Sequence, residues 1–528
     1  MNRAVFALVA ILCLLSVSSI TGLIQVVKAD GGTITINADG SITPSTAPIQ
    51  RNGDTYTLTG NVNIISDADG IVVERDNIIL DGAGYTVTGS GIGNGTTLTN
   101  ISNVTVRNLT IKNFTRGIWL GSSSGNTLSD NNVTANNEGG IWVYDSSSNN
   151  TLSGNNVTAN NIEGINLVFS SNSTVSGNNI ANNTFGIYLD SSSGNTLSGN
   201  SAANNDYGIE IDYSSGNTLS GNNVTANTYD GIYLYSSSGN TLSGNAMVGN
   251  EHNFGVYGTG FSEFLQSIDT SNLVDGKPVY YFVNQSNIMV NPDAYPEVGY
   301  LGFFNCANVT VQGMNLTSNR QGLLLAYTND SQITGNNAAN NEEGIWLESS
   351  SGNTLSGNNV TANDLNGIWL YSSSNNVLSG NNVANNAKGI WLYSSSDNNT
   401  LSGNNITNSD FGIWFESSSG NFIFHNNFVN NTNQVLIMGV LANVWDNGSV
   451  GNYWSDYLTK YPNAAETDGS GVWNTPYVID TNNTDHYPFV VQYVVPEFPS
   501  IQATMFFILL TLLTVIIYKK KGVKTSQS

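Results

Sequence analysis

One phrase recurs along this chain every 22 to 24 residues, and that period restricts the possible folds more than any other feature. The phrase Gly-Ile-Trp-Leu, first seen at Gly117, returns with variations at Gly140, Gly164, Gly186, Gly208, Gly231, Gly322, Gly344, Gly367, Gly389 and Gly412. A second phrase, Asn-Thr-Leu-Ser-Gly-Asn, keeps step with it from Asn195, Asn217, Asn240, Asn353 and Asn399. Such a period is typical of a solenoid, in which each repeat contacts only its neighbours.

Each repeat contains three short apolar segments separated by Gly, Asn and Ser, as in the stretch from Asn217 to Ile232. Segments of two to four residues are too short for helices and suit strands, and the residues between them favour turns. The leucine-rich pattern is absent, and a propeller blade needs a longer repeat. The sequence therefore predicts an all-β chain, a parallel β-helix with coils of about 22–23 residues. Equivalent asparagines are expected to stack as hydrogen-bonded ladders.

Strand alternation points the Ile and Leu of each Gly-Ile-x-Leu phrase inward and the residue between them outward. This outward column is rich in aromatic residues, and a second column of Tyr and carboxylates lies beside it. Flat aromatic rings stack on sugar rings, while carboxylates accept hydrogen bonds from hydroxyls, so we predict a carbohydrate-binding face. The alternatives are that the aromatic column only stacks on itself, or that it faces another copy of the protein. The predicted ligand-binding residues are Trp119, Trp142, Tyr188, Tyr233, Trp346, Trp369, Trp391, Trp414, Tyr371, Tyr393, Glu348 and Glu416.

Catalysis is the second hypothesis for this face. Asp190, Asp212 and Glu210 lie on neighbouring coils, and carboxylates one coil apart have the separation that a retaining glycosidase needs. The few basic residues of the repeats, Arg116 and Lys388 among them, are predicted to form no cluster on the aromatic face.

The net charge of −23 opposes nucleic-acid binding and binding of polyanions. Of the two cysteines, Cys13 lies in the apolar leader, so Cys306 stands alone in the mature chain and no disulfide forms there. Sequons recur through the body, which predicts N-glycosylation of an exterior protein. Examples are Asn94, Asn103, Asn108, Asn132, Asn156, Asn223, Asn308, Asn359 and Asn405.

The two ends predict export and anchoring. Residues 1–29 have the charged start and apolar run of a signal peptide, with an uncleaved N-terminal anchor as the alternative. Residues 501–518 are almost unbroken apolar sequence, long enough to span a membrane, and the basic tail 519–528 is then cytoplasmic. In the linker 495–500, the motif of Pro496, Glu497, Phe498 and Pro499 resembles the PEF-CTERM sorting signal of archaeal surface proteins. That resemblance implies that a membrane sortase exchanges the span for a lipid anchor; otherwise the span is a permanent tail anchor.

Between the ends, residues 30–98 are predicted to form an N-terminal cap with the first coils, and residues 99–435 the repeats. Within these, residues 251–305 break the period and are interpreted as irregular coils with a lateral loop. Residues 436–494 are predicted to close the other end. Carboxylates are hard oxygen ligands that suit Ca²⁺, so the cap acids are weak calcium candidates beside the alternative of ordinary loop residues. These acids are Asp446, Asp456, Asp468, Asp480 and Asp485.

The cap phrase Gly-Asn-Tyr-Trp-Ser-Asp-Tyr from Gly451 to Tyr457, the Thr-Pro-Tyr ending at Tyr477 and the final Asp485-His486-Tyr487-Pro488 resemble the tail of NosD-like proteins. So does Asp-Gly-Lys-Pro-Val-Tyr-Tyr from Asp275. The similarity extends over roughly residues 70–492 and implies a right-handed, single-stranded β-helix of the carbohydrate-binding and sugar-hydrolysis (CASH) type. The family's role in copper-site maturation is disfavoured, because His252, His425 and His486 are scattered and copper prefers clustered ligands.

The sequence therefore predicts an exported protein on the outer face of the membrane, with a β-helix that binds a polysaccharide or serves as an envelope or adhesion component. A polysaccharide-active enzyme on the same fold is the first alternative, and a purely structural surface protein is the second.

Overall fold

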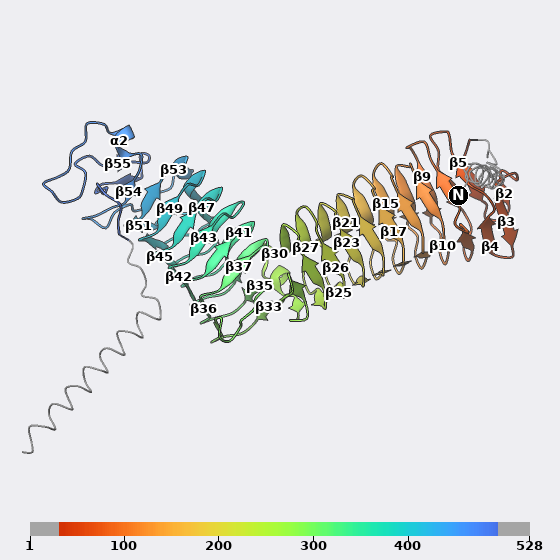
Figure 1. Cartoon of the computed structure of the whole chain (residues 1–528), viewed down its shortest axis with the longest axis horizontal. Helices are drawn as coiled ribbons and strands as arrows, with labels where there is room; N and C mark the ends of the chain where they lie inside the picture. Colours follow the sequence, from red (N-terminus) through yellow and green to blue (C-terminus); the bar gives the residue numbers. More distant parts are fainter. Residues whose placement is uncertain (1–30, 495–528) are drawn as a thin grey trace, which may run out of the picture. The chain divides into compact units, whose positions relative to one another are not determined.

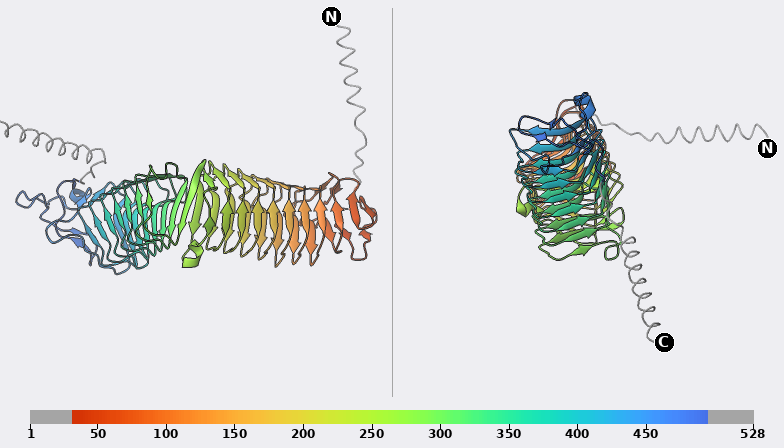
Figure 2. Two further views of the ribbon diagram at one scale, coloured as in Figure 1. Left: turned by 90° about the horizontal axis from the view of Figure 1, so that it is seen from below. Right: turned by 90° about the vertical axis from the view of Figure 1, so that its left-hand side faces the viewer.

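The computed structural model describes residues 31–494, which form a right-handed type of parallel β-helix with about 18 turns of about 22 residues. The strands of successive coils lie side by side in Figures 1 and 2. The predicted signal peptide 1–29, the sorting motif, the span 501–518 and the basic tail fall outside the described residues. Within residues 31–494, no helix has both the length and the apolarity to cross a membrane.

The chain divides into two compact units, one ending at Tyr280 and one beginning at Tyr281, and each is described by itself. In both units a coil contributes one six-residue strand and two three-residue strands to three parallel sheets. A representative coil of unit 1 contains β22 (Thr196–Ser198), β23 (Ser201–Ala203) and β24 (Tyr207–Asp212). The central side chains of the two short strands, Leu197 and Ala202, have no exposed surface. The predicted alternation of inward apolar and outward polar residues is thus present in every strand of this coil.

The six-residue strands form what we call the long-strand sheet. In unit 1 its members after the first coils are β9 (Asn94–Thr99), β12 (Arg116–Gly121), β15 (Gly139–Tyr144), β18 (Glu163–Val168), β21 (Phe185–Asp190), β24, β27 (Asp230–Tyr235) and β30 (His252–Tyr257). In unit 2 they are β38 (Gln321–Ala326), β41 (Glu343–Glu348), β44 (Asn366–Tyr371), β47 (Lys388–Tyr393), β50 (Phe411–Glu416) and β53 (Asn433–Met438), which follow the shorter β35 (Tyr300–Phe304).

The first short strand of each coil, often Thr-Leu-Ser, belongs to what we call the TLS sheet. In unit 1 this sheet includes β10 (Thr105–Arg107), β13 (Thr127–Ser129), β16 (Thr151–Ser153), β19 (Thr174–Ser176), β22, β25 (Thr218–Ser220) and β28 (Thr241–Ser243). In unit 2 it includes β36 (Thr310–Gln312), β39 (Gln332–Thr334), β42 (Thr354–Ser356), β45 (Val377–Ser379), β48 (Thr400–Ser402) and β51 (Phe422–Phe424).

The second short strand, often Asn-Val-Thr, belongs to what we call the NVT sheet. In unit 1 this sheet includes β11 (Thr110–Lys112), β14 (Asn132–Thr134), β17 (Asn156–Thr158), β20 (Asn179–Ala181), β23, β26 (Asn223–Thr225) and β29 (Ala246–Val248). In unit 2 it includes β37 (Asn315–Thr317), β40 (Asn337–Ala339), β43 (Asn359–Thr361), β46 (Asn382–Ala384), β49 (Asn405–Thr407) and β52 (Asn427–Val429).

The glycine that opens each Gly-Ile-x-Leu phrase is required by close packing between coils. A Cβ atom at Gly117 would lie 2.6 Å from the carbonyl oxygen of Gly140 and 2.1 Å from a methyl group of Val133. Carbon and oxygen atoms cannot approach so closely, so any side chain here would push the coils apart. The recurrence of glycine in the sequence is therefore a consequence of stacking.

The turn asparagines form the predicted ladders, which are buried between the sheets. The side-chain amide of Asn155 donates to the amide oxygen of Asn178 at 3.0 Å and to the carbonyl of Leu128, in the coil before, at 2.9 Å. The amide oxygen of Asn155 in turn accepts from the backbone N–H of Asn131 at 3.1 Å. Each asparagine thus satisfies polar groups in two coils, which an apolar side chain of the same size would leave unpaired.

Antiparallel pairs close the described ends. In unit 1, β1 (Ile34–Ile36) pairs with β2 (Ile42–Thr43), and β3 (Ile49–Asn52) pairs with β4 (Thr55–Leu58), ahead of β5 (Val62–Asn63), β6 (Ile71–Val73), β7 (Ile79–Asp81) and β8 (Thr86–Thr88). In unit 2, the final coil ends in β54 (Tyr453–Trp454), α2 (Tyr457–Lys460) and the antiparallel pair β55 (Tyr477–Val478) and β56 (Thr484–Asp485).

Between the regular coils of the two units lie η1 (Phe261–Phe264), β31 (Ser267–Ile268), β32 (Leu273–Val274), β33 (Lys277–Val283) and β34 (Met289–Val290). β31 and β32 still pair in parallel with β28 and β29, so the coil that follows β30 is enlarged but keeps the register of unit 1.

Candidate functional site

The long-strand sheet of unit 1 carries three outward columns, and strand register sets their members. The aromatic column contains Trp119, Trp142, Asn166, Tyr188, Glu210 and Tyr233. Two residues further along each strand, the trailing column contains Gly121, Tyr144, Val168, Asp190, Asp212 and Tyr235. Before the glycine of each phrase, a leading column contains Arg116, Gly139, Glu163, Phe185, Tyr207 and Asp230.

The leading column places one basic residue in each unit against the aromatic column, a contact that the sequence did not predict. The guanidinium of Arg116 lies 4.2 Å from the ring centroid of Trp142 and 5.1 Å from that of Trp119. In unit 2, the Lys388 ammonium lies 3.6 Å from the Trp391 ring and 4.6 Å from the Trp414 ring. The alternation of inward and outward side chains breaks at the phrase glycine. The residue before the glycine therefore lies on the same outward side as the aromatic column.

Arg116 also anchors an acidic pair at this end of unit 1. Its guanidinium forms an ion pair of 2.6 Å with Glu138, and the side-chain amide of Asn166 donates to Glu163 at 3.3 Å. Burial raises the pKa of Glu163, and the charge of Glu138 raises it further, against the opposing charge of Arg116. The Glu163 carboxyl is therefore biased towards the neutral form. Neither glutamate was predicted as a site residue, although the sequence shows that the two lie about one coil apart.

The three catalytic candidates lie together on the adjacent coils. Asp190 and Asp212 are in register on neighbouring strands, and Glu210 is in register with Tyr188. The hydroxyl of Tyr188 donates to Asp212 at 3.1 Å, and Ser191 donates to Asp190 at 2.9 Å. Burial and the charges of Asp212 and Asp190 raise the pKa of Tyr188, so the phenol keeps its proton. The patch combines an aromatic ring with several carboxylate acceptors.

Further aromatic rings border this patch and several are accessible. Tyr213 is 59% exposed and contacts Tyr235 edge-on at 5.4 Å, while Phe169 is 54% exposed and contacts Tyr144. The outward positions of the TLS and NVT sheets of unit 1 carry Thr, Ser, Asn and a few Arg, Lys, Ala or Val, and no aromatic residue from β10 to β29. Within these coils, the aromatic side chains are therefore concentrated on one sheet.

The aromatic column of unit 2 is a run of four tryptophans whose rings stack on one another. Trp369 stacks on Trp346 at 4.6 Å and on Trp391 at 5.0 Å, with interplanar angles of 13° and 6°. Trp414 follows at 6.1 Å from Trp391 with a tilt of 53°. Both ring faces of Trp369 are thus covered, and Trp369 is only 6% exposed. A ligand approaching here would meet indole edges.

The residues beside the tryptophan column repeat the chemistry seen in unit 1. Burial and the charge of Glu342 raise the pKa of Glu343 well above its usual value, while the amide of Asn366 and the charge of Lys388 act in the opposite sense. Burial lowers the pKa of Lys388. Tyr371 and Tyr393 contact each other edge-on at 5.1 Å in the trailing column, in which Glu348 and Glu416 are the outer neighbours. A cation over a tryptophan pair and a glutamate whose pKa is raised by burial therefore occur in each unit.

The five calcium candidates are dispersed over the cap. Asp456 accepts from Tyr477, Asp480 from the side chain of Asn483, and Asp485 from Trp454. Within the described part of the chain, no group of three or more His, Cys, Asp or Glu is arranged to hold a metal ion. Calcium binding therefore stays a prediction from the sequence.

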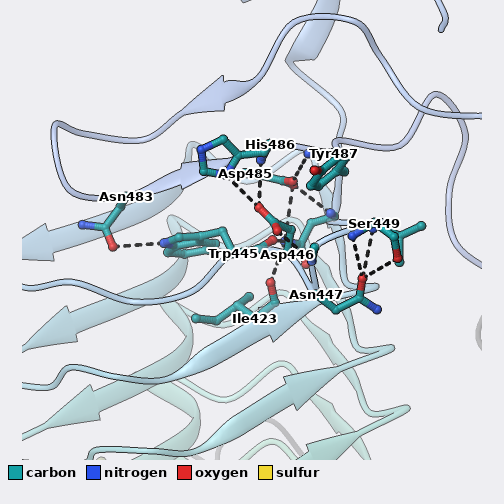
Figure 3. A network of polar contacts seen from close by, with 12 residues as sticks. Ile423, Trp445, Asp446, Asn447, Ser449, Asn483, Asp485, His486 and Tyr487 are labelled. Atoms are coloured by element: carbon teal, nitrogen blue, oxygen red, sulfur yellow. Dashed lines mark hydrogen bonds and ion pairs between the residues drawn. The ribbon is translucent and has the colours of Figure 1, made fainter.

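Asp446 lies in a polar cleft of about 380 Å³ in the cap, lined also by Asn443, Asn482 and His486. The Asp446 carboxylate is 2.9 Å from Nδ1 of His486 and accepts the backbone N–H of the same residue at 3.0 Å (Figure 3). Its other oxygen accepts the N–H of Gly448 at 2.9 Å. The carboxylate thus fixes the orientation of an imidazole that is 62% exposed.

Comparison with known families decides the class of the chain. The family model described as "Periplasmic copper-binding protein (NosD)" matches residues 20–205, 160–275 and 266–459. The chain belongs to the NosD family. No curated protein matches it.

This NosD family member also matches solved β-helix structures at low sequence identity. The A-module of the mannuronan C-5 epimerase AlgE6 of Azotobacter vinelandii is 15% identical, with a TM-score of 0.19, over 80% of this chain and 88% of that one. A catalytic domain of a GH87 α-1,3-glucanase is 12% identical, with a TM-score of 0.29, over 74% and 63%. Tailspike protein 2 of bacteriophage CBA120 is 12% identical, with a TM-score of 0.32, over 54% and 43%. These likenesses concern the fold alone.

The copper named in the family description does not fit the described residues of this NosD family member. His425 stacks on Tyr493 at 4.4 Å, His486 is bonded to Asp446, and His252 lies near Asp230, so the three imidazoles are used in separate places. Burial raises the pKa of the Cys306 thiol and keeps it protonated. Copper prefers imidazole or sulfur ligands gathered at one point, and residues 31–494 contain no group of three or more His, Cys, Asp or Glu arranged to hold a metal ion.

Proposed function

We propose that this chain is an exported β-helix protein that binds a neutral polysaccharide along the long-strand sheet of unit 1. The observation that carries the proposal is the concentration of aromatic residues and carboxylates on one of three sheets. Tyr188, Asp190 and Asp212 form its centre, with Tyr213 accessible at its border. Exposed rings stack on the apolar faces of sugars, and carboxylates accept hydrogen bonds from sugar hydroxyls.

The net charge of −23 favours a neutral or basic glycan over an acidic one. An extended sheet with a repeat of about 4.8 Å per coil offers similar contacts along its length, which suits a polymer better than a small molecule. Membership of the NosD family, whose description is periplasmic, supports export. Anchoring through the sorting motif and the apolar span remains part of the proposal.

An affinity measurement on the full-length chain tests this function. A glycan array identifies the ligand, and titration then compares the wild type with Tyr188→Ala and with Thr196→Ala, which changes an outward residue of the following coil on the TLS sheet. We expect Tyr188→Ala to weaken binding about tenfold or more, as for a central aromatic contact, and Thr196→Ala to have no effect. Equal affinities in all three proteins would refute the proposed face.

The Trp369→Ala, Trp391→Ala double variant shows whether the tryptophan column of unit 2 takes part. Because these rings cover one another, we expect the double variant to lower stability more than affinity. Loss of affinity at unchanged stability would move the binding face to unit 2.

A glycosidase is the second candidate, favoured by the register of Asp190 with Asp212. Residues paired on adjacent strands are about 4.8 Å apart, close to the separation of a retaining carboxylate pair. Hydrolysis of the bound glycan that disappears in Asp190→Asn and Asp212→Asn would establish it. Binding without turnover in the wild type would exclude it.

A further inference from the structure

The cap loop after Trp445 contains the sequon Asn447-Gly448-Ser449, whose asparagine and serine are both exposed. The side-chain oxygen of Asn447 accepts three hydrogen bonds, from the N–H of Ser449 at 3.1 Å, its hydroxyl at 2.9 Å and the N–H of Val450 at 3.0 Å (Figure 3). Gly448 has a φ of +87°, a conformation that glycine adopts easily and that closes this tight turn.

This turn places the two functional groups of the sequon in contact. The serine hydroxyl donates to the amide oxygen of Asn447 and helps to polarise the amide, while the side-chain nitrogen Nδ2 has no partner among residues 31–494. An asparagine Nδ2 carries two N–H groups, so both remain available at the surface. The loop therefore presents an acceptor nitrogen in a fixed orientation.

Several other sequons of the described residues use this nitrogen to join neighbouring coils. Nδ2 of Asn359 donates to Asn337 at 2.7 Å, that of Asn308 to Asn287 at 2.6 Å, and that of Asn103 to Asn77 at 2.8 Å. A glycan on these residues would replace one of the two N–H groups of a nitrogen that already bridges two coils. Among the sequons of residues 31–494, a hydrogen bond from the sequon hydroxyl to the asparagine side-chain oxygen is found at Asn447.

We propose that Asn447 is an acceptor of an N-linked glycan. The donor is a glycan joined through a phosphate or diphosphate to a polyisoprenoid lipid, and a membrane glycosyltransferase on the outer side catalyses the transfer. A bond forms between Nδ2 and the anomeric carbon, the bond from that carbon to the phosphate oxygen breaks, and the lipid phosphate leaves with the electron pair. Nδ2 loses one proton to a base of the transferase. The inference rests on the proposed export but not on the polysaccharide-binding face, which lies in unit 1.

Mass spectrometry of proteolytic peptides from the protein produced in its native cells tests the proposal. We expect the peptide containing Asn447 to carry a glycan mass in most molecules. Ser449→Ala retains the asparagine but removes the hydroxyl, so glycan occupancy of Asn447 is expected to fall at least tenfold. Ser449→Thr keeps a hydroxyl at this position, so occupancy is expected to stay at the wild-type level. Asn359→Gln is the matched control, expected to leave the total glycan mass unchanged.

An unmodified Asn447 in the native protein would overturn the proposal. So would full occupancy in Ser449→Ala, because the bonded hydroxyl would then be irrelevant. Occupancy of Asn359 equal to that of Asn447 would also overturn it, since the free Nδ2 would no longer distinguish the two. Both residues of the turn are exposed, so folding of each variant is checked by its melting temperature, which is expected to match that of the wild type.

Discussion

The carboxylate of Asp485 accepts the backbone N–H of Asn452 at 2.7 Å, in the position where an asparagine side chain accepts in the preceding coils. Asn426 donates in the same way to Asn452 at 3.0 Å, so Asp485 ends the ladder. The carboxylate also accepts from the indole of Trp454 at 2.9 Å and from the N–H of Tyr487 at 3.1 Å. An aspartate suits this position because both oxygens accept, whereas an asparagine would turn its NH₂ group towards a donor.

We therefore predict that Asp485→Ala destabilises the cap by about 2–5 kcal/mol, because several buried N–H groups lose their acceptor. Asp485→Asn is expected to cost less, since one oxygen remains. Hydrogen exchange of peptides from residues 440–490 measures the local opening. Asp468→Asn, an exposed turn residue of the same cap, serves as the control and should stay within about 0.5 kcal/mol. Unchanged exchange in Asp485→Ala would contradict the role of the ladder terminator.

Asp485 also makes the stability of the cap depend on pH. Burial, with a smaller contribution from the nearby charge of Asp446, raises the pKa of Asp485 to about 7 against hydrogen bonds from Trp454, Asn452 and Tyr487. A raised folded-state pKa means that the folded cap binds a proton more tightly than the unfolded chain does. The stabilisation is complete below the unfolded value near 4 and is lost as the pH rises to about 7.

Cap protection in hydrogen exchange, corrected for the intrinsic exchange rate, should therefore decrease between pH 4 and pH 7. The decrease should be much smaller in Asp485→Asn. Because His486 contacts Asp446 beside this residue, the comparison is repeated in His486→Gln. An identical pH profile in wild type and Asp485→Asn would show that another group is responsible.

The inner and outer asparagines of one coil offer a matched pair for a third prediction. Asn381 is 1% exposed, donates to Leu355 and Asn404 at 2.9 Å each, and accepts from Asn358. Its neighbour Asn382 lies on the outer side of the NVT sheet and donates to Asn359 at 2.7 Å. We predict that Asn381→Ala costs about 3 kcal/mol or more and Asn382→Ala less than about 1 kcal/mol.

Urea denaturation monitored by hydrogen exchange of the neighbouring coils measures this difference, since a solenoid opens locally as well as globally. Equal costs at the two positions would mean that burial of the ladder does not determine its contribution.

The coil architecture could be predicted because stacking imposes its constraints on every repeat. Gly117 must lack a side chain, Asn155 must bridge coils, and the Ile and Leu of each phrase must be buried, so the pattern recurs often enough to be read. The position of Arg116 could not be read in this way. It depends on the break in alternation at the phrase glycine, a backbone detail for which strict period-two alternation gives no signal.

The site itself was only partly predictable for a related reason. Trp346, Trp369 and Trp391 fall in one column by simple counting, but their mutual stacking depends on side-chain rotamers. Whether a ring face is open or covered is therefore decided by packing between coils. The cap has no sequence repeat, so no periodic pattern in the sequence could predict the contacts of Asp485 with Asn452 and Trp454.

Glu163 provides the final prediction. The amide oxygen of Asn166 has no hydrogen-bond partner among residues 31–494, and one oxygen of Glu163 accepts from the Asn166 amide at 3.3 Å. Two adjacent acceptors are satisfied when one group gains a proton, which agrees with a pKa raised by burial and by the charge of Glu138. Glu163→Gln supplies an N–H at the same place and should stabilise unit 1 by about 1 kcal/mol at neutral pH.

Because the folded-state pKa of Glu163 is raised, its stabilisation is present below the unfolded value of 4.5 and is lost as the pH rises through the folded value. The gain from Glu163→Gln should thus be small at pH 4 and larger at pH 8. Glu138→Gln is the control, because its carboxylate is paired with Arg116 and partly exposed, and a small loss is expected at pH 8. Hydrogen exchange of peptides from residues 139–168 at both pH values measures the effect. Destabilisation by Glu163→Gln at pH 8 would show that the carboxylate is ionised in the folded protein and that its charge stabilises this part of unit 1.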